Sequence, residues 1–361
     1  MFRMPPRRSP RSNRRLKSAA AALRELLPPG WTILITENTE REGRVRVGSP
    51  AGATAELLVW ARSELSPRSA AALEPTSGPA IAFARWLSAR TQEVLRERGI
   101  GFLDSTGNAE ITLDSPAVVI RTDGAGRDPK PKQRSGPSLR GSRAIALMRT
   151  LAEVSPPYGV RELADALDVD PGYVSRVLAV LVDETLVERQ PRGPVTGVDW
   201  QAMLRHVARS YELLRSNVVT TYVAPRGIED FFTDLATGRP GRWAVTGSFA
   251  SVRLAPVAAP ALAMVYAEDP ERVAKTGRLF PADRGANVIV LEPSDPIVFE
   301  RTWIADDVPF VSVAQVAIDD MTGNGRMPSE GEALLEWMAR RLDHWRAPSL
   351  ADTVNPTRMS A

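Results

Sequence analysis

Cysteine is absent from the 361 residues of the chain. Its absence excludes disulfide bonds, thiolate nucleophiles and every metal site that uses cysteine ligands. Histidine is scarce, and neither His206 nor His344 has a second ligand at metal-binding spacing. No run of about 18 apolar residues predicts a membrane span, and Arg24 and Glu25 interrupt the apolar stretch that a signal peptide would need. We therefore expect a cytoplasmic protein without a metal or other cofactor.

Positive charge is concentrated in two segments. Residues 1–17 contain seven Lys and Arg and no acid, and residues 121–143 contain seven against Asp123 and Asp128. Because the whole chain has a net charge of +3, the remaining residues are acidic overall. Basic segments attached to acidic folded parts favour a polyanionic partner, although basic unstructured tails of an Arg-rich proteome have the same composition.

Apolar periodicity and turn residues predict a multi-domain α+β protein. Strand-like runs accompany helices over 16–27 and 78–100 in the first part, and strands alternate with helices after residue 217. Ser312 with Gln315, and Ser329 with Glu332, have the spacing of capping boxes. The predicted parts are a basic disordered tail (1–17), an N-terminal small α/β domain (18–122), a basic linker (123–140), a mostly helical domain (141–198), a C-terminal α/β domain (199–345) and a disordered tail (346–361).

The segment 141–198 has the element order of a winged helix-turn-helix domain. A helix that ends at "SPPYG" is followed by the two-turn helix "VRELADAL", the turn "DVD" and a third helix. Asp170 is a favoured N-cap, and Pro171 is tolerated at the first helical position. "LVERQPRGPVTGV" predicts two short strands around a turn, which supply the wing.

The third helix has one apolar side and one side without an evident partner. Its apolar residues are spaced i, i+3, i+4 and i+7, which indicates a core-facing stripe: Val174, Val177, Leu178 and Leu181. The major groove of B-DNA admits an α-helix, so we predict that the other side contacts DNA and that the protein is nucleoid-associated. The alternative is a structural module packed on protein, with Arg176 as a solvated charge.

Each predicted contact follows from side-chain chemistry. Arg176 would bind guanine O6 and N7, whereas Tyr173, Ser175 and the N–H groups at the helix start would bind phosphates. Arginines of the wing would contact the DNA backbone or the minor groove, and the basic linker would follow the phosphates. The predicted DNA-binding residues are Pro171, Gly172, Tyr173, Ser175, Arg176, Arg189, Arg192 and Arg143.

Four motifs in chain order resemble regulators of the AbiEi type, the antitoxin components of type IV toxin–antitoxin systems. They are "GIGFLDSTGNAEI", "GVRELADALDVDPGYVSRVLAVL", "WAVTGSFASVRLAP" and "VSVAQVAIDDMTGNGRMPSEGEALL". The resemblance implies a bacterial, winged-helix transcription regulator that binds operator DNA, and a cognate toxin or other protein as a further partner. A homodimer would suit a two-fold operator. Alternatives are an autorepressing antitoxin or a regulator without a toxin.

Two motifs raise enzymatic alternatives. "WAVTGSFASVRL" resembles the Gly-Ser start of a nucleotidyltransferase fold, but the following strand ends in Glu268 and Asp269, which point to opposite faces and do not form a Mg²⁺-binding pair. In "FLDSTGN", Asp104 is a candidate for a nuclease metal site, yet the sequence is more typical of a turn in which Asp bonds local N–H groups. We therefore expect a C-terminal domain of nucleotidyltransferase-like fold and no catalytic residue.

Overall fold

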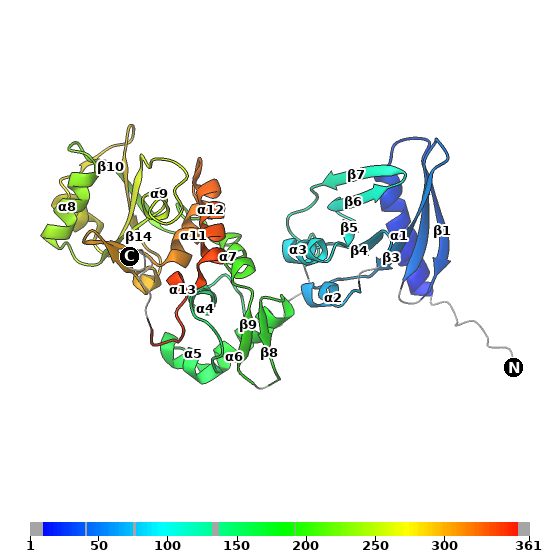
Figure 1. Cartoon of the computed structure of the whole chain (residues 1–361), viewed down its shortest axis with the longest axis horizontal. Helices are drawn as coiled ribbons and strands as arrows, with labels where there is room; N and C mark the ends of the chain where they lie inside the picture. The colour runs from blue at the N-terminus through cyan, green and yellow to red at the C-terminus, as the bar shows by residue number, and fades with distance from the viewer. Residues whose placement is uncertain (1–9, 40–41, 75–76, 132–136, 192, 353–361) are drawn as a thin grey trace. The chain divides into compact units, whose positions relative to one another are not determined.

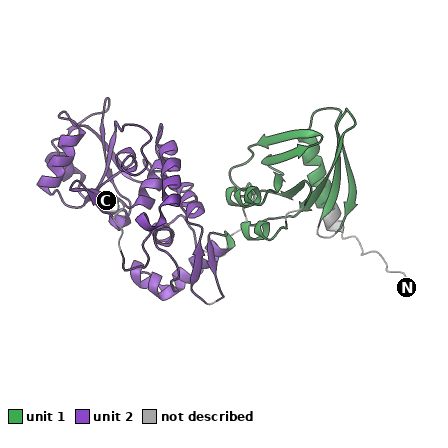
Figure 2. Ribbon diagram, viewed as in Figure 1, with its two compact units in different colours: residues 1–135, 183–185 green, residues 136–182, 186–361 purple. Residues whose placement is uncertain are grey.

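The computed structural model describes residues 10–39, 42–74, 77–131, 137–191 and 193–352. The chain forms two compact units (Figure 2), residues 1–135 with 183–185, and residues 136–182 with 186–361. Residues 141–182 and 186–198 of the helical domain that we predict fall in the same unit as the C-terminal part.

A seven-stranded sheet forms the centre of the first unit, with its strands in chain order (Figure 1). The strands are β1 (Thr32–Asn38), β2 (Gly43–Gly48), β3 (Thr54–Ala61), β4 (Ala80–Ala84), β5 (Gly101–Asp104), β6 (Ala109–Asp114) and β7 (Ala117–Thr122). The central strands β3, β4 and β5 pair in parallel, and all other neighbours pair antiparallel.

Helices cover both faces of this sheet. They are α1 (Pro10–Leu26), α2 (Pro67–Ala71) and α3 (Ala89–Glu97). Successive residues of a strand point to opposite faces, so Leu57 packs in one core with Leu16 of α1, and Leu58 packs in another with Leu95 of α3. Residues 10–17 of the predicted disordered tail belong to α1, and residues 1–9 lie outside the described residues.

The helix predicted over 78–100 is wrong in its first half, which forms strand β4. The strand "AIAFA" lies between β3 and β5 under helices on both faces, so all of its side chains are apolar and the period of two is lost. The helix begins only at Ala89, where the Ser88 Oγ accepts a hydrogen bond from the Thr91 N–H at 3.1 Å.

The second unit begins with the predicted helix-turn-helix and wing. Its elements are α4 (Ser142–Glu153), α5 (Val160–Leu167), α6 (Pro171–Asp183) and the antiparallel strands β8 (Val187–Arg189) and β9 (Val195–Val198). Asp168 ends α5 with a left-handed φ of 51°, a conformation that Asp tolerates. The Val195 N–H bonds the Tyr158 carbonyl at 3.0 Å, which ties the wing to the segment before α5.

A mixed sheet with helices completes this unit. Its strands lie in the order β13-β10-β14-β12-β11-β16-β15, with β12–β14 and β11–β16 parallel. The elements are α7 (Trp200–Ala208), β10 (Val218–Val223), α8 (Ile228–Gly238), β11 (Trp243–Thr246), α9 (Ser248–Ser251), β12 (Ala263–Ala267), α10 (Pro270–Thr276), β13 (Phe280–Pro281), β14 (Val288–Glu292), a 3-10 turn (Pro296–Phe299), β15 (Trp303–Ala305), β16 (Val308–Phe310), α11 (Val313–Thr322), α12 (Met327–Arg340) and α13 (Leu342–Trp345).

One of the two serines of the predicted capping boxes caps a helix, although the Gln315 side chain donates to Asp319 and does not close the box. The Ser312 Oγ accepts from the Gln315 N–H at 3.2 Å and caps α11. Ser329, in contrast, lies inside α12, which begins at Met327 because Pro328 is favoured in a first helical turn.

A buried ion pair joins α4 to the C-terminal part of the unit. Arg149 Nε lies 3.3 Å from Glu153 Oε1, and both residues are almost fully buried. The guanidinium also donates to the Gln315 side chain at 3.2 Å and to the Ile297 carbonyl, while the Ser312 hydroxyl donates to Glu153. These polar contacts and one continuous hydrophobic core make the helix-turn-helix and the C-terminal part a single unit.

The start of the predicted C-terminal tail is ordered against α4. Ala347 is buried, its N–H bonds the Glu153 carbonyl at 2.7 Å, and its carbonyl accepts from the Ser155 N–H at 2.8 Å. Residues 346–352 are thus part of the unit, while residues 353–361 lie outside the described residues. Among the described helices, none has the length and apolar character that a membrane crossing requires.

Candidate nucleic-acid interface

Helix α6 is supported by the apolar stripe that the sequence predicts. Val174, Val177, Leu178 and Leu181 are all fully buried. The start of the helix is also as predicted, because Pro171 is its first residue and Asp170 Oδ1 accepts a hydrogen bond from the Tyr173 N–H at 2.8 Å. One side of α6 is therefore committed to the core of the domain.

The opposite side of α6 faces solvent. Pro171, Gly172 and Arg176 are exposed, and Tyr173 and Ser175 are half-buried, with Tyr173 packed against the hydrophobic core. A Cβ added at Gly172 would lie 3.4 Å from Arg176 Nη1, so the guanidinium lies back over the first turn of the helix. This places the charge at the end of α6 that enters a groove in helix-turn-helix complexes.

The predicted contacts outside α6 have different surroundings. Arg143 is exposed at the second position of α4. Arg189 is half-buried, and its Nε donates to the Gly193 carbonyl at 2.7 Å, so this side chain holds the turn of the wing. Arg192 lies outside the described residues.

Arg161 is a further candidate that the sequence reasoning missed. It is exposed at the second position of α5, and it makes no hydrogen bond or ion pair with the residues that the structure describes. The helix before the recognition helix crosses the DNA backbone in this class of domain. The arginine in the first turn of "VRELADAL" was therefore a usable signal for a phosphate contact.

The polar side chains of the motif that resembles a nucleotidyltransferase, and of the strand that follows it, form hydrogen bonds within the protein. The Thr246 hydroxyl donates to Asp319 Oδ2 at 2.6 Å, and the Ser248 hydroxyl donates to Glu330. Asp269 caps α10 through a 2.9 Å bond from the Arg272 N–H. Within the described ranges, no group of three His, Cys, Asp or Glu side chains could hold a metal ion.

Two adjacent carboxyl groups are buried under α9. Burial raises the pKa of Asp319 to about 6, although hydrogen bonds from Thr246, Gln315 and Tyr266 oppose the shift. Burial also raises the pKa of Asp320 to about 8, and the charges of Asp319 and Glu330 add to the shift. Asp320 is therefore neutral near pH 7, because burial away from water destabilises the charged form of a carboxyl group more than the neutral form.

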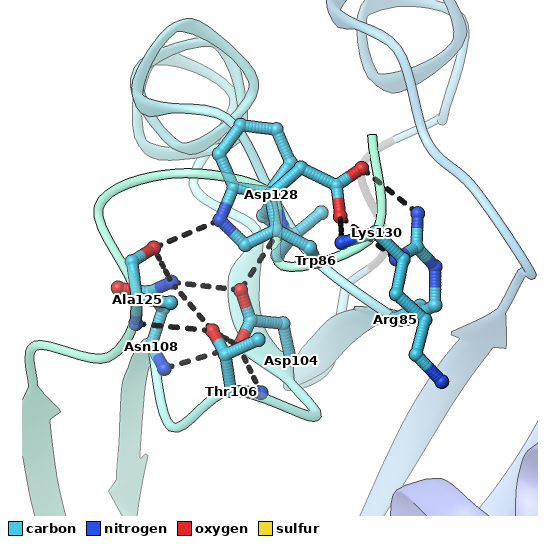
Figure 3. Close-up of polar contacts among 9 residues, drawn as sticks. Arg85, Trp86, Asp104, Thr106, Asn108, Ala125, Asp128 and Lys130 are labelled. Carbon is cyan, nitrogen blue, oxygen red and sulfur yellow. Dashed lines mark hydrogen bonds and ion pairs between the residues drawn. The ribbon is translucent and has the colours of Figure 1, made fainter. Parts of the chain in front are cut away.

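Asp104 forms a turn of the kind that the sequence indicates (Figure 3). Its carboxylate accepts hydrogen bonds from the Leu87 N–H and from the N–H and side-chain groups of Thr106 and Asn108, at 2.7 to 3.2 Å. Gly107, with a φ of 99°, supplies the conformation that the turn requires. Five hydrogen bonds to its carboxylate give Asp104 a structural role, because they stabilise this loop.

The three helices, the wing and the exposed side of α6 define a winged helix-turn-helix domain. Residues 142–191 match the IclR helix-turn-helix domain, a DNA-binding domain, from the first residue of α4 to the turn of the wing. No curated protein and no solved structure matches the chain. The match supports a DNA-binding transcription regulator, and of the four motifs that resemble AbiEi-type regulators it covers one, "GVRELADALDVDPGYVSRVLAVL".

Proposed function

We propose that the protein is a sequence-specific transcription regulator that reads the major groove of DNA with α6. The observation that carries the proposal is the division of α6 into a fully buried stripe and an exposed side with Arg176 over its first turn. A guanidinium in this position binds guanine O6 and N7 through two parallel hydrogen bonds. Arg143 and Arg161, both exposed, supply phosphate contacts that hold the domain in register.

The test is a genome-wide map of bound sites for the wild type, Arg176→Ala and Arg340→Ala. Arg340 is an exposed arginine of α12 and provides a matched loss of one charge. We expect Arg176→Ala to lose sequence preference while it keeps part of its nonspecific affinity, because base contacts specify and phosphate contacts position. An unchanged list of sites for Arg176→Ala would refute the assignment of α6 as the recognition helix.

We also propose that the C-terminal part has no catalytic activity and serves as a sensing or partner-binding domain of nucleotidyltransferase-like fold. Support comes from the hydrogen-bonded hydroxyls of Thr246 and Ser248 and from β12, which is fully buried and contains no carboxylate. The resemblance to AbiEi-type antitoxins suggests a toxin as the partner. Co-expression with the product of the neighbouring gene, followed by co-purification and by sizing of a homodimer, tests this assignment.

A further inference from the structure

The segment 123–130, predicted as part of a linker, is bonded to the first unit (Figure 3). The Gly124 N–H donates to Asn108 Oδ1 at 2.8 Å, and the Ala125 N–H donates to Thr106 Oγ1 at 3.2 Å. The Ala125 carbonyl accepts from Trp86 Nε1 at 2.8 Å. We call the receiving side chains of Arg85, Trp86, Thr106 and Asn108 the linker seat.

Glycine is required where the segment meets the turn. A Cβ at Gly124 would lie 2.5 Å from the Asn108 backbone nitrogen and from the Thr106 carbonyl oxygen. Because both atoms belong to the backbone, an alanine at this position must push the segment off its seat. Gly126, two residues further on, has no atom within 4 Å of the corresponding position.

A bidentate ion pair closes the seat. Arg85 Nη1 and Nη2 donate to the two carboxylate oxygens of Asp128 at 2.7 and 2.8 Å. The hydrogen bond to Asp128 raises the pKa of Arg85, and the nearby carboxylate of Glu64 adds to this shift. Arg85 thus meets a planar anionic group in the geometry that guanidinium offers to carboxylate and phosphate alike.

The position of Arg85 in the sheet is that of a ligand-binding residue. It directly follows β4, at the edge where the parallel strands β3, β4 and β5 have their carboxyl ends. Open sheets with parallel strands bind their ligands at this edge. The anion that fills the position here comes from the connecting segment and not from the sheet or its helices.

We propose that the linker seat is an exchangeable anion site, with Asp128 as its tethered occupant and a phosphate group as the competing ligand. The side chains of Arg85 and Asp128 are 35% and 20% exposed, so water and a small anion reach the pair. Solvent screens this part-exposed pair, and a phosphate group offers Arg85 the same two-oxygen geometry that the Asp128 carboxylate does. When phosphate binds Arg85, Asp128 leaves and the hydrogen bonds of Gly124 and Ala125 open.

The test combines phosphate affinity with hydrogen exchange in the full-length protein. Inorganic phosphate is titrated by calorimetry at an ionic strength held constant with sodium chloride. Asp128→Asn removes the competitor and should raise the phosphate affinity roughly threefold to tenfold, the range expected when one charged hydrogen-bonded pair is lost. Arg85→Gln should abolish phosphate binding. Arg46→Gln, which breaks the exposed Arg46–Glu56 pair of the same unit, should leave it unchanged.

Hydrogen exchange reports the opening of the segment. Phosphate should accelerate exchange of the Gly124 and Ala125 amides in the wild type to the level of Gly124→Ala, whereas Gly126→Ala should exchange like the wild type. Equal phosphate affinity for the wild type and Asp128→Asn, or binding that survives Arg85→Gln, would overturn the proposal. A short DNA duplex in place of phosphate distinguishes the sources, because opening by both ligands assigns a nucleic-acid phosphate and opening by phosphate alone assigns a free anion.

Discussion

Replacement of Asp320 by asparagine should remove a pH-dependent loss of stability from the second unit. In the folded protein, burial raises the pKa of Asp320 to about 8, against an ordinary value of 3.8. Between these two values the folded chain holds a proton that the unfolded chain has released. Stability therefore falls as the pH rises through this range, because the native state binds more protons than the unfolded state.

The different pKa values of Asp319 and Asp320 separate their contributions to the pH dependence of stability. The pKa of Asp319 is raised to about 6, so its similar contribution is largely complete at pH 6. From pH 6 to pH 8, the Asp320 shift corresponds to a loss on the order of 2 kcal/mol in the free energy of unfolding. An asparagine has nearly the same shape and does not ionise, so Asp320→Asn should keep its stability across this window.

Urea unfolding at pH 6, 7 and 8 measures this difference. Asp283→Asn provides the control, because Asp283 is an exposed carboxylate of the same unit. We expect a falling stability for the wild type and for Asp283→Asn, and a flat profile for Asp320→Asn. If Asp320→Asn falls as steeply as the wild type, the carboxyl group of Asp320 is not the source of the proton linkage.

Three further substitutions test other parts of the structure. Arg149→Ala should lower the free energy of unfolding by roughly 1–3 kcal/mol because the buried Glu153 keeps only Arg301, at 3.6 Å, as its cation, and urea unfolding beside Arg340→Ala measures this loss. Asp104→Ala should destabilise the first unit by at least about 2 kcal/mol, since several buried donors lose their acceptor; a thermal unfolding curve equal to that of the wild type would contradict the turn. Arg161→Ala should weaken binding to two unrelated duplexes equally and reduce the salt slope by about 0.9, as titrations at several salt concentrations would show.

The helix-turn-helix could be predicted from the sequence because each of its signals is local. Asp170 caps the helix that Pro171 begins, and the capping bond is made within three residues. The core-facing stripe repeats at the helical period over two turns, so the sequence alone predicts that one side of α6 is buried. Its other side could be recognised as exposed only by elimination, and the structure supports that reading.

The errors of sequence reasoning come from contacts between distant residues. The sequence of β4 predicts part of a helix because its neighbours bury every residue after Ala80, and burial on both faces removes the period of two. The segment 123–130 has the Gly, Pro and charge composition of a linker, yet its bonding partners are side chains from Arg85 to Asn108. Composition carries no information about such partners.

Arg149 shows the same limit with a larger consequence. An arginine on an amphipathic helix predicts a solvated charge, whereas this one is buried against Ile297 and Gln315, about 150 residues further along the chain. The hydrogen bonds of Arg149 to Gln315 and Ile297 help to join the helix-turn-helix and the C-terminal part in one unit. Local patterns predict three separate domains because they contain no information about these contacts, whereas the described chain divides into two compact units.

The position of this ion pair in α4 constrains how the C-terminal part can influence DNA binding. The buried stripe of α6 supports the recognition helix from inside the helix-turn-helix, while Arg149 and Glu153 hold α4 to the C-terminal part. The exposed side of α6 takes no part in either attachment. A change around Gln315 or Ser312 acts directly on α4, because these side chains bond Arg149 and Glu153. If a ligand or partner of the C-terminal part controls binding, the ion pair lies on the route, and a substitution there should uncouple control from affinity.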